Sequence, residues 1–263
     1  MTAAAGRLAG RRALVVGASR GIGAAIARAY ADEGAAVAAC ARSTEALAGL
    51  REEAAADGLA IEVLGADAAD PEAVTAAVAE ATARLGGIDI LVYAAGQGVV
   101  GPFATHDDDA WRSLYEVNVL GAVRFARAVL PAMREAGWGR IVNIASTAGK
   151  YGSLYQSPYN ATKHALVGLT RCLALEEAST GITVNAICPG FVDTAMVRSA
   201  VPEWAPLLGL PEDRVLDAVV SRVPIGRMIE TSEVAELACY VASPAAGAMT
   251  GQGLTLAGGL ILI

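Results

Sequence analysis

The 263-residue chain has little lysine, few aromatic residues and little charge. Lys150 and Lys163 are its only lysines, aromatic residues make up 5%, and charged residues make up 18%. With 20 basic and 27 acidic residues the net charge is −7, so no general polyanion-binding surface is indicated and we expect no nucleic-acid partner. The hydrophobic fraction of 54% excludes intrinsic disorder and predicts a large core.

Cys-x-x-Cys pairs and export signals are also lacking. Each of the four cysteines lies in an apolar run, which predicts reduced core residues and a cytoplasmic location: Cys40, Cys172, Cys188 and Cys239. The N-terminal segment has arginines where a signal peptide has its apolar stretch, so we expect no export. Residues 237–263 carry no charge, but Pro244 and five glycines predict a helix end, a loop and a buried strand rather than a membrane span.

Short apolar runs alternate with longer amphipathic segments along almost the whole chain. This alternation is typical of β-α-β units. It predicts an α/β fold with one domain over residues 1–263: a Rossmann-type, doubly wound parallel sheet of seven strands, with helices on both faces. Strands are expected near 13–17, 36–41, 60–66, 88–94, 139–145, 182–188 and 253–257, and helices near 21–34, 44–57, 71–85, 107–135, 156–180 and 231–243.

Residues 194–230 depart from this alternation. Four prolines interrupt an apolar stretch that leads into no strand: Pro202, Pro206, Pro211 and Pro224. We interpret the segment as an excursion from the sheet that serves as a substrate lid.

A glycine-rich turn follows the first predicted strand and opens a helix. It reads Gly17-Ala18-Ser19-Arg20-Gly21-Ile22-Gly23, which is GxxxGxG rather than GxGxxG. Glycines let the backbone approach a pyrophosphate closely, and a helix N-terminus offers it free N–H groups and a positive dipole end. A plain strand-to-helix turn is the alternative, but the position at the first β-α junction favours a dinucleotide site.

The second predicted strand ends without the acidic residue that would bind a ribose 2′-hydroxyl. Arg42 and Ser43 follow it instead, and Arg20 lies in the glycine turn. Two guanidinium groups there would suit a 2′-phosphate, so the sequence favours NADP(H) over NAD, with two solvated arginines as the alternative. Asp67, at the end of the third predicted strand, is expected to bind the adenine amino group or to cap its own turn.

Candidate catalytic residues follow the fifth predicted strand. Tyr159 and Lys163 are four residues apart in a predicted helix, so the phenol and the ammonium share one face. A neighbouring cation favours the phenolate and lowers the pKa of a tyrosine, which would make Tyr159 an acid or base. Ser146 ends the strand before this helix, at the edge where such sheets bind ligands, and could hold a carbonyl oxygen. A turn serine and a packing tyrosine are the alternatives.

Together these residues resemble the short-chain dehydrogenase/reductase family over essentially the full chain. The matching features are the glycine turn, Asn118 in Glu116-Val117-Asn118-Val119, Ser146, the pair Tyr159 and Lys163, and the segment Pro189-Gly190-Phe191-Val192-Asp193-Thr194. The resemblance implies transfer of a hydride between NADP(H) and a carbonyl carbon, without a metal. Ser146 would polarise the carbonyl, Tyr159 would donate the proton, Lys163 would lower the Tyr159 pKa and bind the nicotinamide ribose, and Asn118 would hold a water.

The resemblance, with the residue arguments above, assigns a cofactor-binding set. Its members lie in the glycine turn, at the ends of the following strands, in the catalytic helix and in the Pro-Gly segment: Gly17, Ser19, Arg20, Gly21, Ile22, Gly23, Arg42, Ser43, Asp67, Ala68, Ala95, Gly96, Tyr159, Lys163, Pro189, Gly190, Val192 and Thr194. One departure concerns the family's Asn-Asn-Ala-Gly, which here reads Tyr93-Ala94-Ala95-Gly96. We expect this change to remove hydrogen bonds that brace the sheet, without removing a catalytic group.

Within the family the chain looks most like the aromatic (type II) polyketide ketoreductases, notably in GWGRIVNIASTAGK, GITVNAICPGFVDT and RVPIG. These enzymes reduce a ketone on a carrier-bound or cyclised polyketide with NADPH. A 3-hydroxybutyrate dehydrogenase and a β-ketoacyl carrier-protein reductase are alternatives, and a non-catalytic NADP-sensing protein is an alternative from another class. The expected substrate pocket, with ordinary core packing as its alternative, contains Ser146, Tyr151, Phe191, Met196 and Trp204.

Two further partners are expected. The uncharged tail Gly258-Gly259-Leu260-Ile261-Leu262-Ile263 would expose apolar surface in a monomer, and the resemblance implies a homotetramer. A carrier protein that delivers the ketone would need an arginine patch near the entrance, for which Arg198, Arg222 and Arg227 are the candidates.

Overall fold

A computed structural model describes residues 6–262 of the chain; residues 1–5 and 263, the two ends of the predicted domain, lie outside this range. Seven parallel strands form one sheet in the order β3-β2-β1-β4-β5-β6-β7. The strands are β1 Arg12–Val16, β2 Ala36–Ala41, β3 Ile61–Gly65, β4 Ile90–Tyr93, β5 Gly139–Ile144, β6 Ile182–Pro189 and β7 Gly253–Leu256. The predicted single-domain, seven-stranded fold is confirmed.

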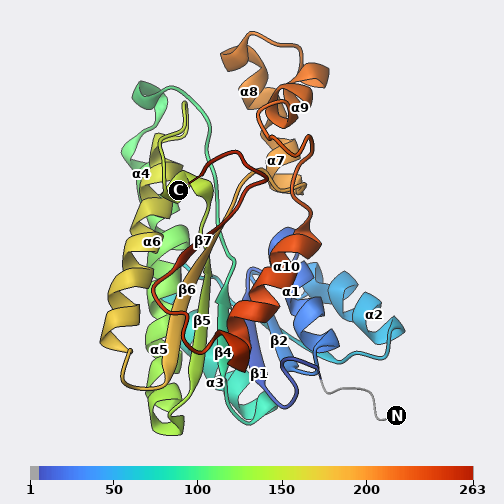
Figure 1. Ribbon diagram of the computed structural model, residues 1–263, viewed down its shortest axis with the longest axis vertical. Coiled ribbons are helices and arrows are strands. Elements are labelled where there is room, and N and C mark those ends of the chain that lie inside the picture. The colour runs from blue at the N-terminus through green and yellow to red at the C-terminus, as the bar shows by residue number, and fades with distance from the viewer. Residues whose placement is uncertain (1–5, 263) are drawn as a thin grey trace.

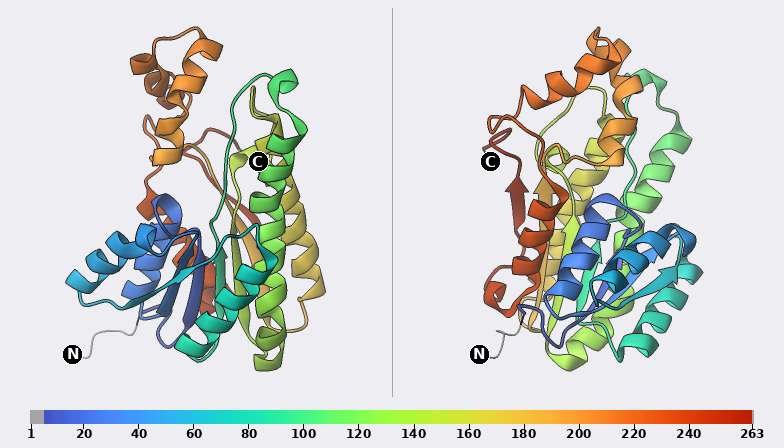
Figure 2. Two further views of the ribbon diagram at one scale, coloured as in Figure 1. Left: turned by 180° about the vertical axis from the view of Figure 1, so that it is seen from behind. Right: turned by 90° about the vertical axis from the view of Figure 1, so that its right-hand side faces the viewer.

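Helices cover both faces of the sheet (Figure 1). They are α1 Gly21–Asp32, α2 Ala48–Ala56, α3 Pro71–Leu85, α4 Asp108–Tyr115, α5 Gly121–Ala136, α6 Ser157–Glu176, α7 Ala195–Ser199, α8 Val201–Leu208, α9 Glu212–Val220 and α10 Thr231–Ala242. In Figure 2, α1, α2 and α10 lie against one face, and α3, α5 and α6 against the other. Each face has its own apolar core, built around Tyr30 on the first and around Phe125 on the second.

Local sequence signals explain where several helices begin and end. Asp70 accepts hydrogen bonds from the Glu72 and Ala73 backbone N–H groups, and Pro71 occupies the first position of α3. Gly86 and Gly137 end α3 and α5 in the left-handed conformation, with φ of 77° and 63°. These caps hold the helices at the lengths needed to span the sheet.

The long helix expected over 107–135 is interrupted. Between α4 and α5 the turn Glu116–Leu120 is π-helical, and the Gly121 N–H donates to the Glu116 carbonyl five residues earlier. The hydrophobic periodicity of this region does not distinguish a helix with one wider turn from a regular helix. The π-helical turn carries Asn118, so the irregularity lies at the predicted site.

Two expectations about burial were wrong. Cys172 is exposed on α6, whereas Cys40, Cys188 and Cys239 are buried as expected, because an apolar run in a helix has an outward face too. Strand β7 is half-buried rather than buried, because it forms the edge of the sheet. In residues 6–262 no helix combines the length and the hydrophobicity that a bilayer crossing requires. At the C-terminal tail, the side chain of Leu262 is 90% exposed.

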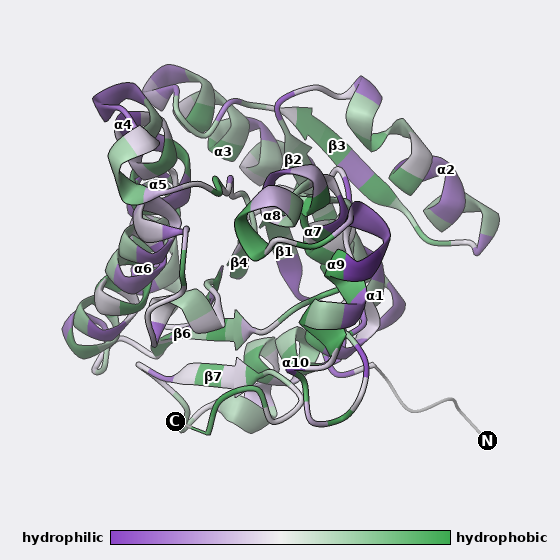
Figure 3. Ribbon diagram, turned by 90° about the horizontal axis from the view of Figure 1, so that it is seen from above, coloured by the Kyte–Doolittle hydropathy of each residue, from purple (hydrophilic) through white to green (hydrophobic). Residues whose placement is uncertain are grey.

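The segment 194–230 leaves the sheet at its carboxyl edge. It contains α7, α8 and α9, and a parallel bridge between Val192 and Ile229 joins its two ends at the base. Figure 3 looks onto that edge and shows the three helices above the ends of the strands. The predicted excursion from the sheet is therefore present, and it overhangs the position where the candidate residues gather.

Candidate active site

Two cavities open at the carboxyl edge of the sheet and meet at Tyr159. The first, of about 220 Å³, is lined by the glycine turn and by the ends of β2, β3, β4 and β5. The second, of about 360 Å³, lies between Ser146, the loop 151–156 and the helices α7 to α9. Tyr159 and Met196 line both cavities, Lys163 lines the first, and Ser146 lines the second. Residues that are far apart in the chain thus form one continuous site.

The glycine turn is compact because its backbone lies against the segment after β4. A Cβ atom at Gly17, whose φ is 83°, would lie 2.4 Å from the Ala95 amide nitrogen. At Gly96 a Cβ would lie 3.5 Å from both the Asn118 Oδ1 and the Lys163 Nζ atoms. Glycine at position 17 therefore lets the turn lie directly against the Ala95 backbone. The cavity that runs from the N-terminus of α1 to Lys163 fits a dinucleotide.

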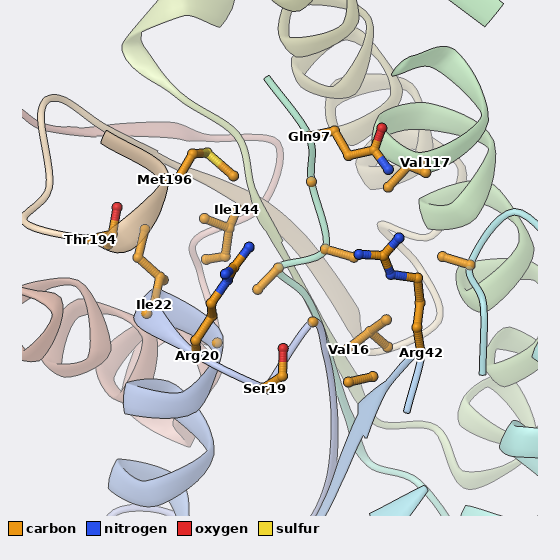
Figure 4. A pocket seen from close by; sticks show the side chains of 18 of the residues that line it. Val16, Ser19, Arg20, Ile22, Arg42, Gln97, Val117, Ile144, Thr194 and Met196 are labelled. Atoms are coloured by element: carbon orange, nitrogen blue, oxygen red, sulfur yellow. The ribbon is translucent and has the colours of Figure 1, made fainter. Parts of the chain in front are cut away.

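Arg20 and Arg42 both line the first cavity. Figure 4 shows Arg20 projecting from the glycine turn and Arg42 from the end of β2. Both side chains are exposed, and neither forms an ion pair with another of the described residues. Asp67 also lines this cavity, and its Oδ1 accepts a hydrogen bond of 2.9 Å from the Ala69 N–H, so it caps its own turn as well.

Most of the predicted cofactor-binding residues line the first cavity, but four do not. Ser43 is not among the lining residues, and its hydroxyl donates to Glu45 at 2.6 Å. Pro189 and Val192 lie outside the lining, Val192 because it is buried in the bridge to Ile229. Gly190 lines the second cavity instead.

Helix α6 places Tyr159 and Lys163 on one face, as the spacing predicts. Lys163 is 4% exposed, and its ammonium donates a hydrogen bond of 3.0 Å to the Ile144 carbonyl at the end of β5. Burial lowers the pKa of Lys163 to about 8, because no carboxylate compensates for its lost hydration. Burial is also the largest influence on the pKa of Tyr159.

Burial raises the pKa of Tyr159 above its ordinary value, and a hydrogen bond with the Ser146 side chain acts in the opposite direction. The expected lowering of the Tyr159 pKa by Lys163 is not the largest effect. The Lys163 Nζ atom is 5.6 Å from the centre of the Tyr159 ring and donates a hydrogen bond to the Ile144 carbonyl. Ser146 follows β5 and accepts a hydrogen bond of 3.0 Å from the Ala148 N–H, so it is a turn serine as well as part of the site.

Asn118 is fully buried and its side chain joins three segments. Its Oδ1 accepts from the Gln97 N–H at 2.8 Å, and its Nδ2 donates to the Gln97 carbonyl at 2.9 Å and to the Thr162 hydroxyl at 3.0 Å. Thr162 in turn donates to the Tyr159 carbonyl at 2.8 Å. Asn118 therefore fixes the π-helical turn, the segment after β4 and α6 relative to one another.

The segment that replaces the usual Asn-Asn-Ala-Gly makes a hydrogen bond of its own at the end of β4. Tyr93 is fully buried, its hydroxyl donates to the Val117 carbonyl, and its ring centre lies 6.1 Å from that of Phe125. The expectation of lost hydrogen bonds is thus incomplete, because the tyrosine hydroxyl forms a bond that a strand-end motif read by itself does not reveal.

All five predicted substrate-pocket residues line the second cavity: Ser146, Tyr151, Phe191, Met196 and Trp204. Phe191 and Trp204 pack edge to face, with ring centres 6.1 Å apart. Among the candidate docking arginines, Arg198 pairs with Asp193 and Arg227 with Glu233, both at 2.7 Å. Arg222 lines the cavity and forms no ion pair within residues 6–262.

Sequence reasoning missed several lining residues. Gln97 lies in the first cavity and holds Asn118, and its place directly after Gly96 at a strand end is a signal that could have identified it. Leu207, Leu208, Tyr155 and Gln156 line the second cavity, and nothing in their spacing indicates it. Tyr155 has a φ of 63°, a strained conformation for tyrosine.

The fold and the site together define a class of dinucleotide-binding protein, and comparison with known proteins names the family. The family model of the short chain dehydrogenases matches residues 11–204, and the chain belongs to this family. A protein assigned as a ketoacyl reductase of the granaticin polyketide synthase of Streptomyces violaceoruber is 43% identical over 261 residues, 98% of this chain and 96% of that protein. A D-beta-hydroxybutyrate dehydrogenase of Rhizobium meliloti is 35% identical over 260 residues, with 95% and 98% covered.

A solved structure extends the comparison to three dimensions. The crystal structure of a variant of actinorhodin polyketide ketoreductase with NADPH superposes with a TM-score of 0.93 at 41% identity. The match covers 97% of this chain and 98% of the other. The predicted family and its doubly wound fold are both confirmed.

Proposed function

We propose that this protein is an NADPH-dependent ketoreductase that reduces a ketone to a secondary alcohol, on a polyketide or another bulky substrate. The observation that carries the proposal is that Tyr159 lines both cavities, with Lys163 beside it in one and Ser146 in the other. A proton donor at the junction of a dinucleotide cradle and an apolar cavity is what carbonyl reduction requires. The similarity to polyketide ketoreductases supports the substrate class.

Each residue of the site has a separate role in the proposed reaction. NADPH supplies the hydride that adds to the carbonyl carbon. The Ser146 hydroxyl would donate a hydrogen bond to the carbonyl oxygen, and Tyr159 would donate the proton that completes the secondary alcohol. Lys163 stabilises the phenolate left on Tyr159 and binds the ribose, and Asn118 holds the water that returns a proton.

Arg20 and Arg42 would hold the 2′-phosphate that distinguishes NADPH from NADH. Both residues are exposed and line the first cavity, and neither forms an ion pair with a carboxylate among the described residues. The absence of an acidic residue at the end of β2 supports the same choice. In our proposal Gly17, Gly21 and Gly23 complete the pyrophosphate site, and the segment 194–230 is the lid over the substrate.

Several finer points are predictions as well. A carrier protein would deliver the ketone past Arg222, which is the one of the three candidate arginines left without a carboxylate partner in the described chain. Assembly into a homotetramer and a cytoplasmic location stay predictions from the sequence.

The test is the loss of NADPH absorbance with three ketones: a bicyclic ketone, an acetoacetyl thioester and acetoacetate, each repeated with NADH. Turnover of the bicyclic ketone with NADPH supports the proposal. Preference for acetoacetate with NADH contradicts both the cofactor and the substrate, and indicates a 3-hydroxybutyrate-type dehydrogenase. Preference for the acetoacetyl thioester indicates a β-ketoacyl reductase. Tight NADPH binding without any turnover indicates the sensing protein.

A further inference from the structure

Tyr93 and the π-helical turn Glu116–Leu120 are joined by one buried hydrogen bond. Tyr93 is the last residue of β4 and is fully buried. Its hydroxyl donates to the carbonyl of Val117, the residue directly before Asn118. Tyr93 stands at the first position of the segment that departs from the motif Asn-Asn-Ala-Gly.

The end of β4 and the segment after it hold the turn at two successive residues, Val117 and Asn118. The Tyr93 hydroxyl binds the Val117 carbonyl, and the Gln97 backbone binds the Asn118 side chain through both its N–H and its carbonyl. A π-helical turn departs from the regular ladder of helix hydrogen bonds, so it gains from outside partners. Tyr93 and Gln97 provide those partners from either side of Gly96.

Gly121 makes room for the Tyr93 hydroxyl. A Cβ atom at Gly121 would lie 2.1 Å from the Tyr93 hydroxyl oxygen and 3.0 Å from the Ala68 Cβ atom. Glycine is a poor helix residue, and Gly121 begins α5 with ordinary helical angles. Its presence there is explained by the space that the tyrosine hydroxyl occupies.

We propose that Tyr93 is a positioning residue that fixes Asn118, with Gly121 as the complementary position that admits its hydroxyl. The proposal rests on the proposed function, in which Asn118 holds a water of the proton path. Its effect reaches Tyr159, because Asn118 donates to Thr162 and Thr162 donates to the Tyr159 carbonyl.

The experiment compares Tyr93→Phe with a matched control, Tyr30→Phe. Tyr30 is also fully buried, and its hydroxyl donates to the Ala238 carbonyl at 3.0 Å, on the opposite face of the sheet. For Tyr93→Phe we expect kcat to fall about fivefold, the size of one neutral hydrogen bond, with KM for NADPH and ketone unchanged within about twofold. Amide exchange over residues 116–121 should become at least about tenfold faster. For Tyr30→Phe we expect neither change.

Equal losses of kcat in the two variants, or unchanged exchange over residues 116–121 in Tyr93→Phe, would overturn the proposal. Faster exchange with unchanged kcat would overturn it too, because the turn would then be held without a consequence for the reaction. If the wild-type protein reduces no ketone, the proposed function fails, and the exchange comparison still decides whether Tyr93 holds the turn.

Gly121→Ala provides a second comparison. It should lower kcat about tenfold in the wild-type background, and less in the Tyr93→Phe background, where the hydroxyl that meets the new Cβ atom is missing. An equal loss in both backgrounds would contradict the pairing of the two residues. If Gly121→Ala does not fold, the rescue of folding by Tyr93→Phe tests the same contact.

Discussion

The Nζ atom of Lys163 lies 5.6 Å from the centre of the Tyr159 ring, and both groups are withdrawn from water. Burial raises the pKa of Tyr159, so its phenol remains protonated and able to donate at neutral pH. Burial lowers the pKa of Lys163 to about 8, so its charge is present below that pH and is lost above it.

The rate of ketone reduction should therefore fall as the pH rises through about 8, with Lys163 as the group that titrates. The measurement is kcat/KM for the ketone from pH 6 to about 10, because this ratio reports the free enzyme. Thermal unfolding followed at each pH controls for loss of the fold. An alkaline limb with its midpoint near the ordinary lysine pKa of about 10.4 would contradict the assignment.

Arg42→Ala should raise KM for NADPH at least about tenfold and leave KM for NADH nearly unchanged, because a hydrogen bond to a charged group contributes about 1.5–3 kcal/mol. The steady-state constants for both cofactors measure this. Arg51→Ala is the control, since Arg51 is exposed on α2 and does not line the cavity. A similar loss for NADPH and NADH would show that Arg42 does not contact the 2′-phosphate.

Gly17→Ala should destabilise the protein and weaken NADPH binding, because the new Cβ atom would meet the Ala95 amide nitrogen at 2.4 Å. Gly58→Ala is a matched control: Gly58 has a φ of 77°, close to the 83° of Gly17, but no atom within 4 Å of the added Cβ. The left-handed conformation alone costs about 1–2 kcal/mol, so the control should lose that much free energy of unfolding and Gly17→Ala more. Chemical denaturation and fluorescence titration with NADPH measure both effects. Equal losses would mean that the close approach is unimportant.

Arg222→Ala should raise KM for a ketone presented on an acidic carrier protein several-fold and leave KM for the free bicyclic ketone nearly unchanged, because Arg222 lies at the substrate cavity without a carboxylate partner in the described chain. Arg214→Ala serves as the control, since Arg214 pairs with Asp217 outside the cavity. If both substrates are affected alike, Arg222 contacts the ketone rather than the carrier.

Much of the site could be predicted because its signals are local. The glycine turn lies at a strand-to-helix junction, and the spacing of Tyr159 and Lys163 places both on one face of a helix. In a parallel sheet both features lie at the carboxyl edge, where they line one cavity. Arg20 and Arg42 are candidates for the 2′-phosphate because the second strand ends without an acidic residue and Arg42 follows it. In each case a few neighbouring residues carry the information.

The remaining features depend on contacts between distant residues. The hydrophobic pattern of residues 107–135 does not reveal one wider, π-helical turn inside a helix. The role of Tyr93 depends on Val117 and Gly121, which are 24 and 28 positions away. Ser43 follows Arg42 directly, yet its hydroxyl binds Glu45 and the residue does not line the cavity. Burial also reverses the expected pKa shift of Tyr159, because desolvation depends on the packed structure.

The most direct test of the account is single-turnover oxidation of NADPH by the wild-type protein and by Tyr159→Phe, with NADPH binding measured in parallel by fluorescence. The bicyclic ketone is the substrate. We expect Tyr159→Phe to bind NADPH within about twofold of the wild type but to oxidise it at least about 100-fold more slowly, because a general acid is lost. Oxidation at the wild-type rate by Tyr159→Phe would contradict the assignment of Tyr159 as the proton donor.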